Sequence, residues 1–424
     1  MLKPPAAAPR RALLRPTPRV LLTIRGRMVA VLVLASLLIM GALWPIHAQD
    51  AADQDITAQA TTTPDAPPNH IAPGIYPQDI NPLTGLPVSD PATLDRRPIV
   101  VKVSNSPALV RPQAGIGQAD LVYEHYTEAG ITRFSAIFYG EAPRRVGSIR
   151  SARLIDYELV PMYQGLLAFA GASIGVDKRI YGSEQVTEWL CATRDDPDPC
   201  RAEVDVVGPP GFIPPSDFVE RAYKGVLIGP PIYARDPTLP VPHNLFVDIQ
   251  ALWERAAAEG HNQRPDLTGM TFSETPPPAV GSGTYAQVRY RTTTAEWVYD
   301  SDLGLYQRLT DGQPHFDANL EAPVRAANVV IVYVGHYLTD IVESQWQDTI
   351  HWSAQITLWP EGEAVLLRDG LRYEARWQRP TRPELLSLVT PDGAPLPFKP
   401  GNTWFQVVPL PEQMDSDLES VRVE

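Results

Sequence analysis

The chain has 424 residues, enough for one large domain or several smaller ones with an ample core. It carries 36 basic and 49 acidic side chains, and the first 27 residues hold seven of the basic ones and no acid. The remainder therefore has 29 basic against 49 acidic groups, which argues against non-specific binding of nucleic acid. Forty-five prolines favour loops and short strands over long helices.

The first 80 residues divide into three segments. Residues 1–27 are basic and are expected to stay in the cytoplasm, and residues 28–46 form an apolar run of 19 residues without a charge. A run of this length is close to the ~20 residues that span a bilayer, and the basic residues before it predict an exported body. The run is longer than a usual signal-peptide core, so an uncleaved membrane anchor is favoured over a cleaved signal, which would leave a secreted protein. Residues 47–80 are rich in Ala, Thr, Pro and Asp, which predicts a disordered stalk.

The two cysteines, Cys191 and Cys200, lie nine positions apart around the turn-prone segment DDPDP. A metal site would need more ligands, so a disulfide is favoured over free thiols or a metal. A disulfide requires an oxidising compartment, in agreement with an exported body.

Residues 111–153 contain the densest group of motifs in the chain. Two apolar runs, Leu121–Tyr126 and Thr132–Phe138, are joined by the turn-like Glu128-Ala129-Gly130, which predicts a hairpin. Apolar residues spaced along 154–164 predict a helix soon after Arg153.

Several stretches resemble the YerB-like family, extracytoplasmic bacterial proteins whose domain has no known function. The resemblance rests on RPQAGIGQADLVYE (111–124), EAGITRF (128–134), GSIRSAR (147–153), the opening NPLTGLPV (81–88), HNLF (243–246) and PGNTW (400–404). It covers about Asn81 to Pro409 and implies a layered α/β sandwich in which the two halves pack as one unit. It carries over no known reaction. Many members are lipoproteins, but no cysteine follows the apolar run here, so lipid anchoring is not expected.

The fold class predicted is α+β, with a mixed N-terminal half over 81–261 and a mostly antiparallel β C-terminal half over 282–411. The clearest helix is expected over 249–259, and the Pro-rich connector 262–281 is taken as the boundary between two subdomains. Residues 412–424 form an acidic tail that is expected to fray.

A candidate anion site is centred on Arg150 and Arg153, which flank Ser151 near the predicted helix start. The alternative is that the arginines pair with Glu124, Glu128 and Asp156 and hold the hairpin against the helix. The candidate ligand-binding residues are Arg111, Glu124, Arg133, Arg150, Ser151, Arg153, His243 and Asn244.

No phosphate loop, dinucleotide fingerprint, zinc motif or EF-hand loop occurs, so neither a cofactor nor a metal is predicted. Ser173 lies in a G-x-S-x-G sequence, but the helix expected after such a nucleophile has a poor apolar face. Aromatic residues of the C-terminal half could line a groove for sugars or peptides, although sheet core is the favoured interpretation. These residues are Trp297, Tyr299, Trp346, Trp352, Trp377 and Trp404.

Two functional classes remain. The first is a non-catalytic, membrane-tethered module that binds a cell-envelope component or an envelope protein. The second is an envelope hydrolase or transferase that holds an anionic substrate with the arginines. The absence of a convincing nucleophile–base or metal motif in the sequence favours the first class.

Overall fold

The computed structural model describes residues 70–71, 76–192, 200–201 and 215–424. The basic segment 1–27 and the expected anchor 28–46 lie outside the described residues. Within the described part of the chain, no helix is both long and apolar enough to cross a membrane.

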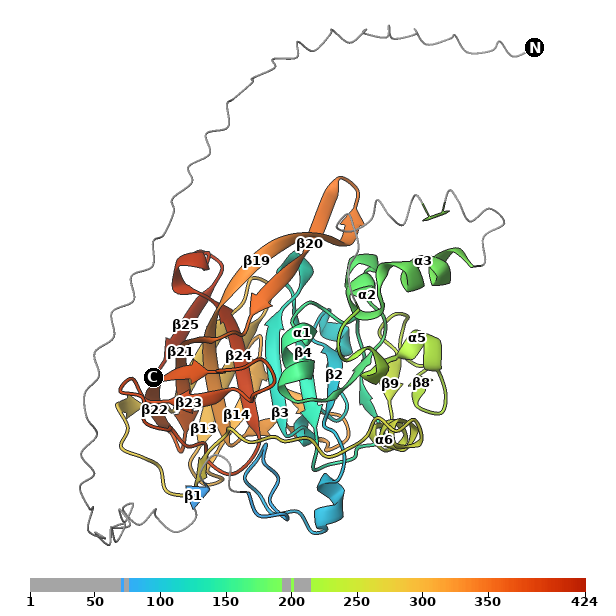
Figure 1. The fold of residues 1–424 in the computed structure, drawn as a ribbon. Helices are drawn as coiled ribbons and strands as arrows, with labels where there is room; N and C mark the ends of the chain where they lie inside the picture. The colour runs from blue at the N-terminus through green and yellow to red at the C-terminus, as the bar shows by residue number, and fades with distance from the viewer. Residues whose placement is uncertain (1–69, 72–75, 193–199, 202–214) are drawn as a thin grey trace, which may run out of the picture. The chain divides into compact units, whose positions relative to one another are not determined.

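A twelve-stranded sheet forms the centre of the fold (Figure 1). Ten strands follow one another across it, β20 (Thr349–Thr357) pairs with β19, and β23 (Ser387–Val389) pairs with β22. The ten, in spatial order, are β11 (Gly281–Ser282), β22 (Leu371–Gln378), β21 (Glu361–Arg368), β19 (Asn328–Trp346), β24 (Thr403–Pro409), β3 (Leu121–Tyr126), β4 (Thr132–Phe138), β2 (Ile99–Ser104), β6 (Leu166–Phe169) and β7 (Ala222–Lys224).

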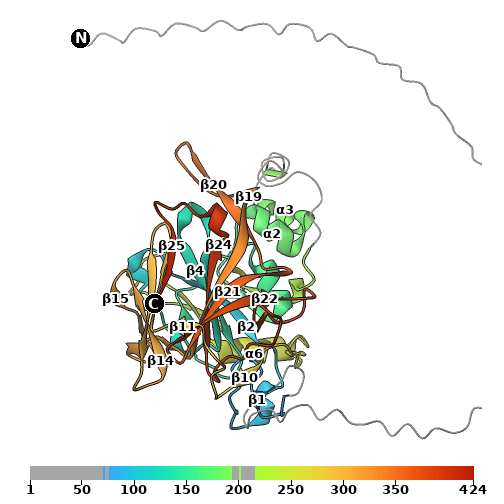
Figure 2. The same ribbon diagram turned by 90° about the vertical axis from the view of Figure 1, so that its left-hand side faces the viewer.

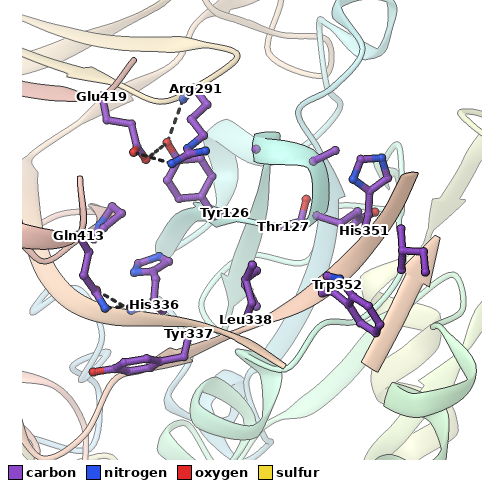
Figure 3. A pocket seen from close by; sticks show the side chains of 16 residues that line it. Tyr126, Thr127, Arg291, His336, Tyr337, Leu338, His351, Trp352, Gln413 and Glu419 are labelled. Atoms are coloured by element: carbon purple, nitrogen blue, oxygen red, sulfur yellow. Dashed lines mark hydrogen bonds and ion pairs between the residues drawn. The ribbon is translucent and has the colours of Figure 1, made fainter. Parts of the chain in front are cut away.

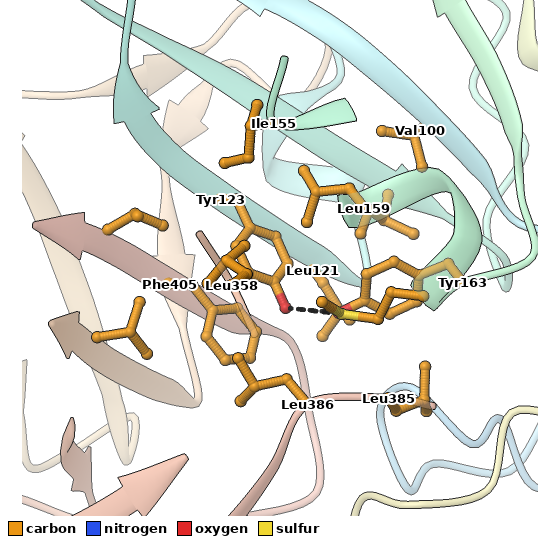
Figure 4. Close-up of a cluster of buried hydrophobic side chains, with 14 of the residues drawn as sticks. Val100, Leu121, Tyr123, Ile155, Leu159, Tyr163, Leu358, Leu385, Leu386 and Phe405 are labelled. Carbon is orange, nitrogen blue, oxygen red and sulfur yellow. Dashed lines mark hydrogen bonds between the residues drawn. The ribbon is translucent and has the colours of Figure 1, made fainter. Parts of the chain in front are cut away.

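The two predicted halves share this sheet. Strand β24 of the C-terminal half pairs in parallel with β3 of the N-terminal half, with Thr403 opposite Leu121. At this seam the rings of Tyr123 and Phe405 stack with their centroids 4.3 Å apart (Figure 4). The connector 262–281 therefore separates the two halves along the chain, while their strands share one sheet.

Both faces of the main sheet are covered (Figure 2). On one face lie α1 (Asp156–Met162) and α2 (Ile174–Tyr181), which is followed by α3 (Ser183–Cys191). On the other face lie α6 (Ile249–Ala258) and a six-stranded antiparallel sheet. Strand β2 shows why both faces are covered, because Val100 packs into the first core and Val101 into the second.

The smaller elements complete the two covering layers. The second sheet consists of β15 (Gln313–Pro314), β14 (Leu305–Thr310), β13 (Thr294–Asp300), β12 (Tyr285–Arg289), β25 (Ser420–Val423) and β18 (Arg325–Ala326). A three-stranded sheet consists of β5 (Val146–Gly147), β9 (Leu245–Val247) and β8 (Tyr233–Arg235), and the short helix α5 spans Gly225–Ile228. Two strand pairs join β1 (His70–Ile71) to β10 (Phe272–Ser273) and β16 (Phe316–Asp317) to β17 (Ala322–Pro323).

Two expectations about the chain ends require correction. The tail 412–424 is not frayed, because β25 pairs with β12 over four residues and Glu419 is buried. Most of the expected stalk 47–80 lies outside the described residues, but its last part is structured. Strand β1 pairs with β10, and the Tyr76 hydroxyl donates a hydrogen bond to the Met270 carbonyl.

The disulfide is confirmed. Cys191 and Cys200 are bonded, with their Cα atoms 5.7 Å apart.

A buried ion pair joins the main sheet to the second sheet. Glu124 on β3 accepts a hydrogen bond from Arg308 on β14 at 2.8 Å, and neither side chain is exposed. Asn105 and Thr132 donate to the other carboxylate oxygen at 3.0 and 2.9 Å. The Arg308 guanidinium also lies 4.8 Å from the ring centroid of Trp404.

We expect the Arg308→Met substitution to destabilise the fold by about 3–5 kcal/mol, because it leaves the buried Glu124 carboxylate without its counter-ion. The double variant Glu124→Gln, Arg308→Met should lose less than the sum of the two single variants. Urea unfolding of all four proteins measures this coupling. Strict additivity would contradict the assignment of this pair as the link between the sheets.

Candidate functional site

Six strands of the main sheet end at the same edge. Strands β19, β24 and β3 run parallel to one another, and so do β2, β6 and β7. Strand β4 lies antiparallel between β3 and β2, so both groups point the same way. In open α/β sheets, ligands bind outside the carboxyl ends of the strands. We call this rim the carboxyl edge.

A hairpin arm extends beyond the carboxyl edge. Strand β19 is 19 residues long, and β20 folds back along its outer part (Figure 1). Between the arm and the β3–β4 turn lies a groove of about 320 Å³. The turn places Ala129 and Gly130 at positive φ, and a Cβ at Gly130 would lie 3.1 Å from the Arg291 side chain. Glycine at this position therefore allows the turn to approach the second sheet closely.

The arm lines the groove with apolar side chains that have no place in the core. Leu338 is 76% exposed, Tyr337 is 55% exposed and Trp352 is 36% exposed. Figure 3 shows Leu338, His351 and Trp352 standing on the arm, with Tyr126 and the Arg291–Glu419 ion pair on the other side of the groove. The groove therefore combines exposed aromatic and aliphatic surface with polar groups at its margin.

The C-terminal tail supplies part of the groove wall. The Tyr126 hydroxyl donates to the buried Glu419 carboxylate at 2.6 Å, and Arg291 pairs with the same carboxylate at 3.3 Å. The Gln413 amide donates to the His336 carbonyl at 3.1 Å. These contacts fix the wall, and none was foreseen from a tail expected to fray.

A cluster of charged side chains lies beside the β3–β4 turn. The two oxygens of Glu128 accept hydrogen bonds from Arg153 at 2.5 and 2.7 Å, and Arg133 donates to one of them at 3.0 Å. Arg153 also lies 3.4 Å from Glu343, whose side chain has no exposed surface. Arg153 thereby connects the β3–β4 turn to the arm. These ion pairs give Arg133 and Arg153 the structural role that the sequence left as the alternative.

The arginines shift the ionisation of Glu128. Burial opposes the charge of this carboxylate, but the positive charges of Arg133 and Arg153 outweigh burial and lower its pKa to about 2. Burial, together with the neighbouring charge of Arg153, lowers the pKa of Arg133 to about 9.

The remaining candidate residues have different surroundings. Arg111 pairs with Asp311 at 2.9 Å, and the Asn244 side chain accepts from Arg235 at 2.7 Å. The Ser151 carbonyl accepts from Arg133 at 3.0 Å. His243 lies near Arg150, whose positive charge adds to burial in lowering the pKa of the imidazole. Glu124 is held in the ion pair described above.

A hydroxyl–amine pair that the sequence did not reveal lies beneath the cluster. Lys102 on β2 donates to the Ser135 hydroxyl on β4 at 2.6 Å, and it lies 3.0 Å from both His125 and Asp156. Burial lowers the pKa of Lys102 to about 8. Serine and lysine so placed resemble a nucleophile with its base, but all four side chains are buried.

Ser173 is not part of such a pair. Its hydroxyl accepts from the Val176 N–H at 3.4 Å, so it caps α2, the helix whose apolar face the sequence showed to be poor. Among the described residues, no group of three or more His, Cys, Asp or Glu side chains could hold a metal ion.

The aromatic residues divide between core and groove. Trp297, Trp377 and Trp404 are buried, as the favoured interpretation expected, whereas Trp352 is exposed at the groove. The side chain of Trp346 lies outside the described part of the structure. The exposed face of Trp352 could not have been inferred, because the strand pattern around it does not show that β20 leaves the body.

Comparison with known proteins identifies the family. The model for "Protein of unknown function (DUF3048) N-terminal domain" matches residues 83–197, and the model for the C-terminal domain of the same family matches residues 286–405. The chain belongs to this YerB-like family. The two matched ranges lie in the N-terminal and C-terminal halves that share the main sheet.

Two similarities to Bacillus subtilis YerB agree with this assignment. The chain is 28% identical over 334 residues to the protein named "Putative lipoprotein YerB", which covers 77% of this chain and 86% of that protein. It also superposes on the crystal structure of YerB with a TM-score of 0.60 and 26% identity, over 81% of this chain and 99% of the other. The YerB-like fold class inferred from the sequence, a layered α/β sandwich, is confirmed.

We expect the Glu128→Gln substitution to reduce the acid sensitivity of the YerB-like domain. The native pKa of about 2 lies below the ordinary value of 4.5, so the ionised carboxylate stabilises the fold above pH 4.5. That contribution, about 3 kcal/mol, is lost as the pH falls from 4.5 through 2. Urea unfolding at pH 7 and at pH 3 measures it. Equal falls in wild type and variant would contradict the ion pairs described for Glu128.

Proposed function

We propose that this protein is a non-catalytic binding module, tethered at the extracytoplasmic face of the cell membrane, that holds a cell-wall component in the groove at the carboxyl edge. The observation that carries the proposal is the arm, which presents Tyr337, Leu338 and Trp352 to solvent over an open groove. Exposed apolar groups that gather in one place mark binding sites more often than scattered ones do.

The groove suits a ligand with both apolar and hydroxyl or amide surface. Aromatic side chains offer flat apolar faces at small conformational cost, and His351, Thr127 and Gln413 place polar groups beside them. A sugar or a short peptide of the cell wall presents this mixture of surfaces.

Three observations support the location. The relative in Bacillus subtilis carries the name of a lipoprotein, which would place that protein on a membrane. The Cys191–Cys200 disulfide suits an oxidising compartment. Residues 28–46 have the length and flanking charges of an anchor.

The test compares two exposed tryptophans. Trp352 lines the groove and is 36% exposed, whereas Trp189 on α3 is 39% exposed and does not line the groove. We expect the full chain and the Trp189→Ala variant to co-sediment with purified cell-wall sacculi, and Trp352→Ala to bind at least about fivefold more weakly, because ~1 kcal/mol of aromatic contact is lost. Failure of the wild type to sediment, or equal sedimentation of both variants, would overturn the proposal.

The side chains of Ser135 and Lys102 have the chemistry of a nucleophile and its base, which would support the enzymatic alternative. A substrate, however, cannot reach them. A nucleophile must meet its substrate, and neither Ser135 nor Lys102 has exposed surface. Lys102 forms a buried ion pair with Asp156 at 3.0 Å, which gives Lys102 and Asp156 a structural role in joining β2 to α1.

We therefore expect a fluorophosphonate probe not to label the folded protein. Intact-mass spectrometry after incubation measures the label, and the Ser135→Ala variant serves as the matched control. A stoichiometric adduct that disappears in Ser135→Ala would show a reactive serine and would favour the hydrolase or transferase over the binding module.

A further inference from the structure

Arg150 is the arginine of the cluster that has no counter-ion. Among the described residues, no hydrogen bond or ion pair involves its guanidinium, and its Nε is buried without a partner. The acid whose charge reaches it is Glu128, and both oxygens of Glu128 are bonded to Arg133 and Arg153. Arg150 therefore lies beside a carboxylate whose hydrogen bonds go to other residues.

Among the residues that the structure describes, the charges around Arg150 sum to one excess positive charge. Arg133, Arg150 and Arg153 contribute three positive charges, and Glu128 and Glu343 contribute two negative ones. Nearby charged groups do not change this balance. Lys102 pairs with Asp156, and Lys224 pairs with Asp177. An uncompensated, half-buried guanidinium is costly unless an anion accompanies it.

The backbone places polar groups around Arg150. Ile149 forms a bridge with Val103 on β2, so Ser148 and Arg150, on either side of Ile149, project to the same face of the extended segment. The Ile149 N–H donates to the Leu245 carbonyl at 2.7 Å, which brings the segment that holds His243 alongside.

Two of these polar groups also lack partners. The Ser148 hydroxyl and the Nδ1 atom of His243 are buried and form no hydrogen bond with any residue in the described part of the chain. Buried polar groups are nearly always satisfied, and an ion can be what satisfies them. A hydroxyl hydrogen rotates freely and an imidazole can donate from either nitrogen, so both can turn toward an oxyanion.

We propose that the carboxyl edge holds a phosphate group at Arg150, with Ser148 and His243 as additional donors. The guanidinium binds two phosphate oxygens through its planar donors. A carboxylate would be satisfied by the guanidinium alone, whereas phosphate has further oxygens for the hydroxyl and the imidazole. The location agrees with ligand binding outside the carboxyl ends of parallel strands, here β2, β6 and β7.

This site is separate from the groove, although Glu128 borders both. The phosphate could belong to a lipid headgroup or to a soluble envelope polymer, since the recognising chemistry is the same. The proposal rests on its own observations and does not depend on the proposed function.

The test uses the full chain in detergent micelles, titrated with inorganic phosphate by calorimetry. We expect Arg150→Gln to weaken phosphate binding at least tenfold and His243→Gln to weaken it severalfold. The matched control is Arg144→Gln, which removes the same charge from a side chain that is 81% exposed. It should change the affinity less than twofold. Equal effects of Arg144→Gln and Arg150→Gln would reduce the binding to general charge attraction and overturn the proposal.

A second measurement separates binding from folding. Because Arg150 has no ion pair to lose, Arg150→Gln should have a melting temperature equal to or above that of the wild type. A large fall would assign Arg150 a structural role and overturn the proposal. Acetate that binds as tightly as phosphate would also overturn it.

Competition identifies the source of the phosphate. We expect a short-chain phosphatidylglycerol or a soluble glycerol phosphate oligomer to displace inorganic phosphate. Displacement by the first supports a lipid headgroup, and displacement by the second supports a polymer. If neither competitor displaces inorganic phosphate, the proposal that the site binds the phosphate of an envelope molecule is overturned. Trp352→Ala should leave all of these affinities unchanged, so this proposal and the groove can fail independently.

Discussion

The parallel pairing of β24 with β3 is the constraint on which the rest of the structure depends. It aligns Thr403 through Gln406 with Leu121 through Glu124, although almost 300 residues separate the two strands. Parallel neighbours need a long connection, which here is most of the chain. Because the pairing is parallel, the ends of β3 and β24 meet at one edge.

That edge is where the fold has unusual features. The β3–β4 turn, the segment after β24 and the outward run of β19 all begin there, and they form the groove. The charged cluster lies behind the turn because β4 starts at the same edge with Arg133 near its first residue. An antiparallel seam would have sent β24 the other way and separated these elements.

The charge at the carboxyl edge has the opposite sign to the net charge of the chain. The chain has a formal net charge of −13, yet three arginines gather around Glu128. Two of them neutralise acids that hold the turn and the arm together. The third, Arg150, contributes no such contact, so stability alone does not explain its presence.

The sequence was informative where structure is determined locally. The apolar runs Leu121–Tyr126 and Thr132–Phe138 predicted β3 and β4 to the residue, and the helix expected over 249–259 is α6. The short spacing of Cys191 and Cys200 similarly sufficed for the disulfide. In each case neighbours in the chain decide the structure.

Sequence reasoning failed where the interacting residues lie far apart along the chain. Nothing near Arg153 indicates that Glu343, 190 positions later, is one of its ionic partners. The acidic tail was expected to fray, but the Arg291 ion pair and the Tyr126 hydrogen bond stabilise the charge of its buried Glu419. The sequence also grouped Arg111 and Glu124 with the arginine cluster, whereas Asp311 and Arg308 hold them in contacts of their own.

The arm is the part of the fold that packing explains least. Part of it is anchored, since Val334, Ile341 and Ile356 belong to the core beside α1 and α2. Tyr337, Leu338, Ile350 and Trp352 are exposed instead. Ordering such residues costs conformational entropy that their own burial does not recover. A strand of 19 residues, where about five or six are usual, is therefore longer than the core requires. The length beyond the core builds one wall of the groove, so binding accounts for the arm better than folding does.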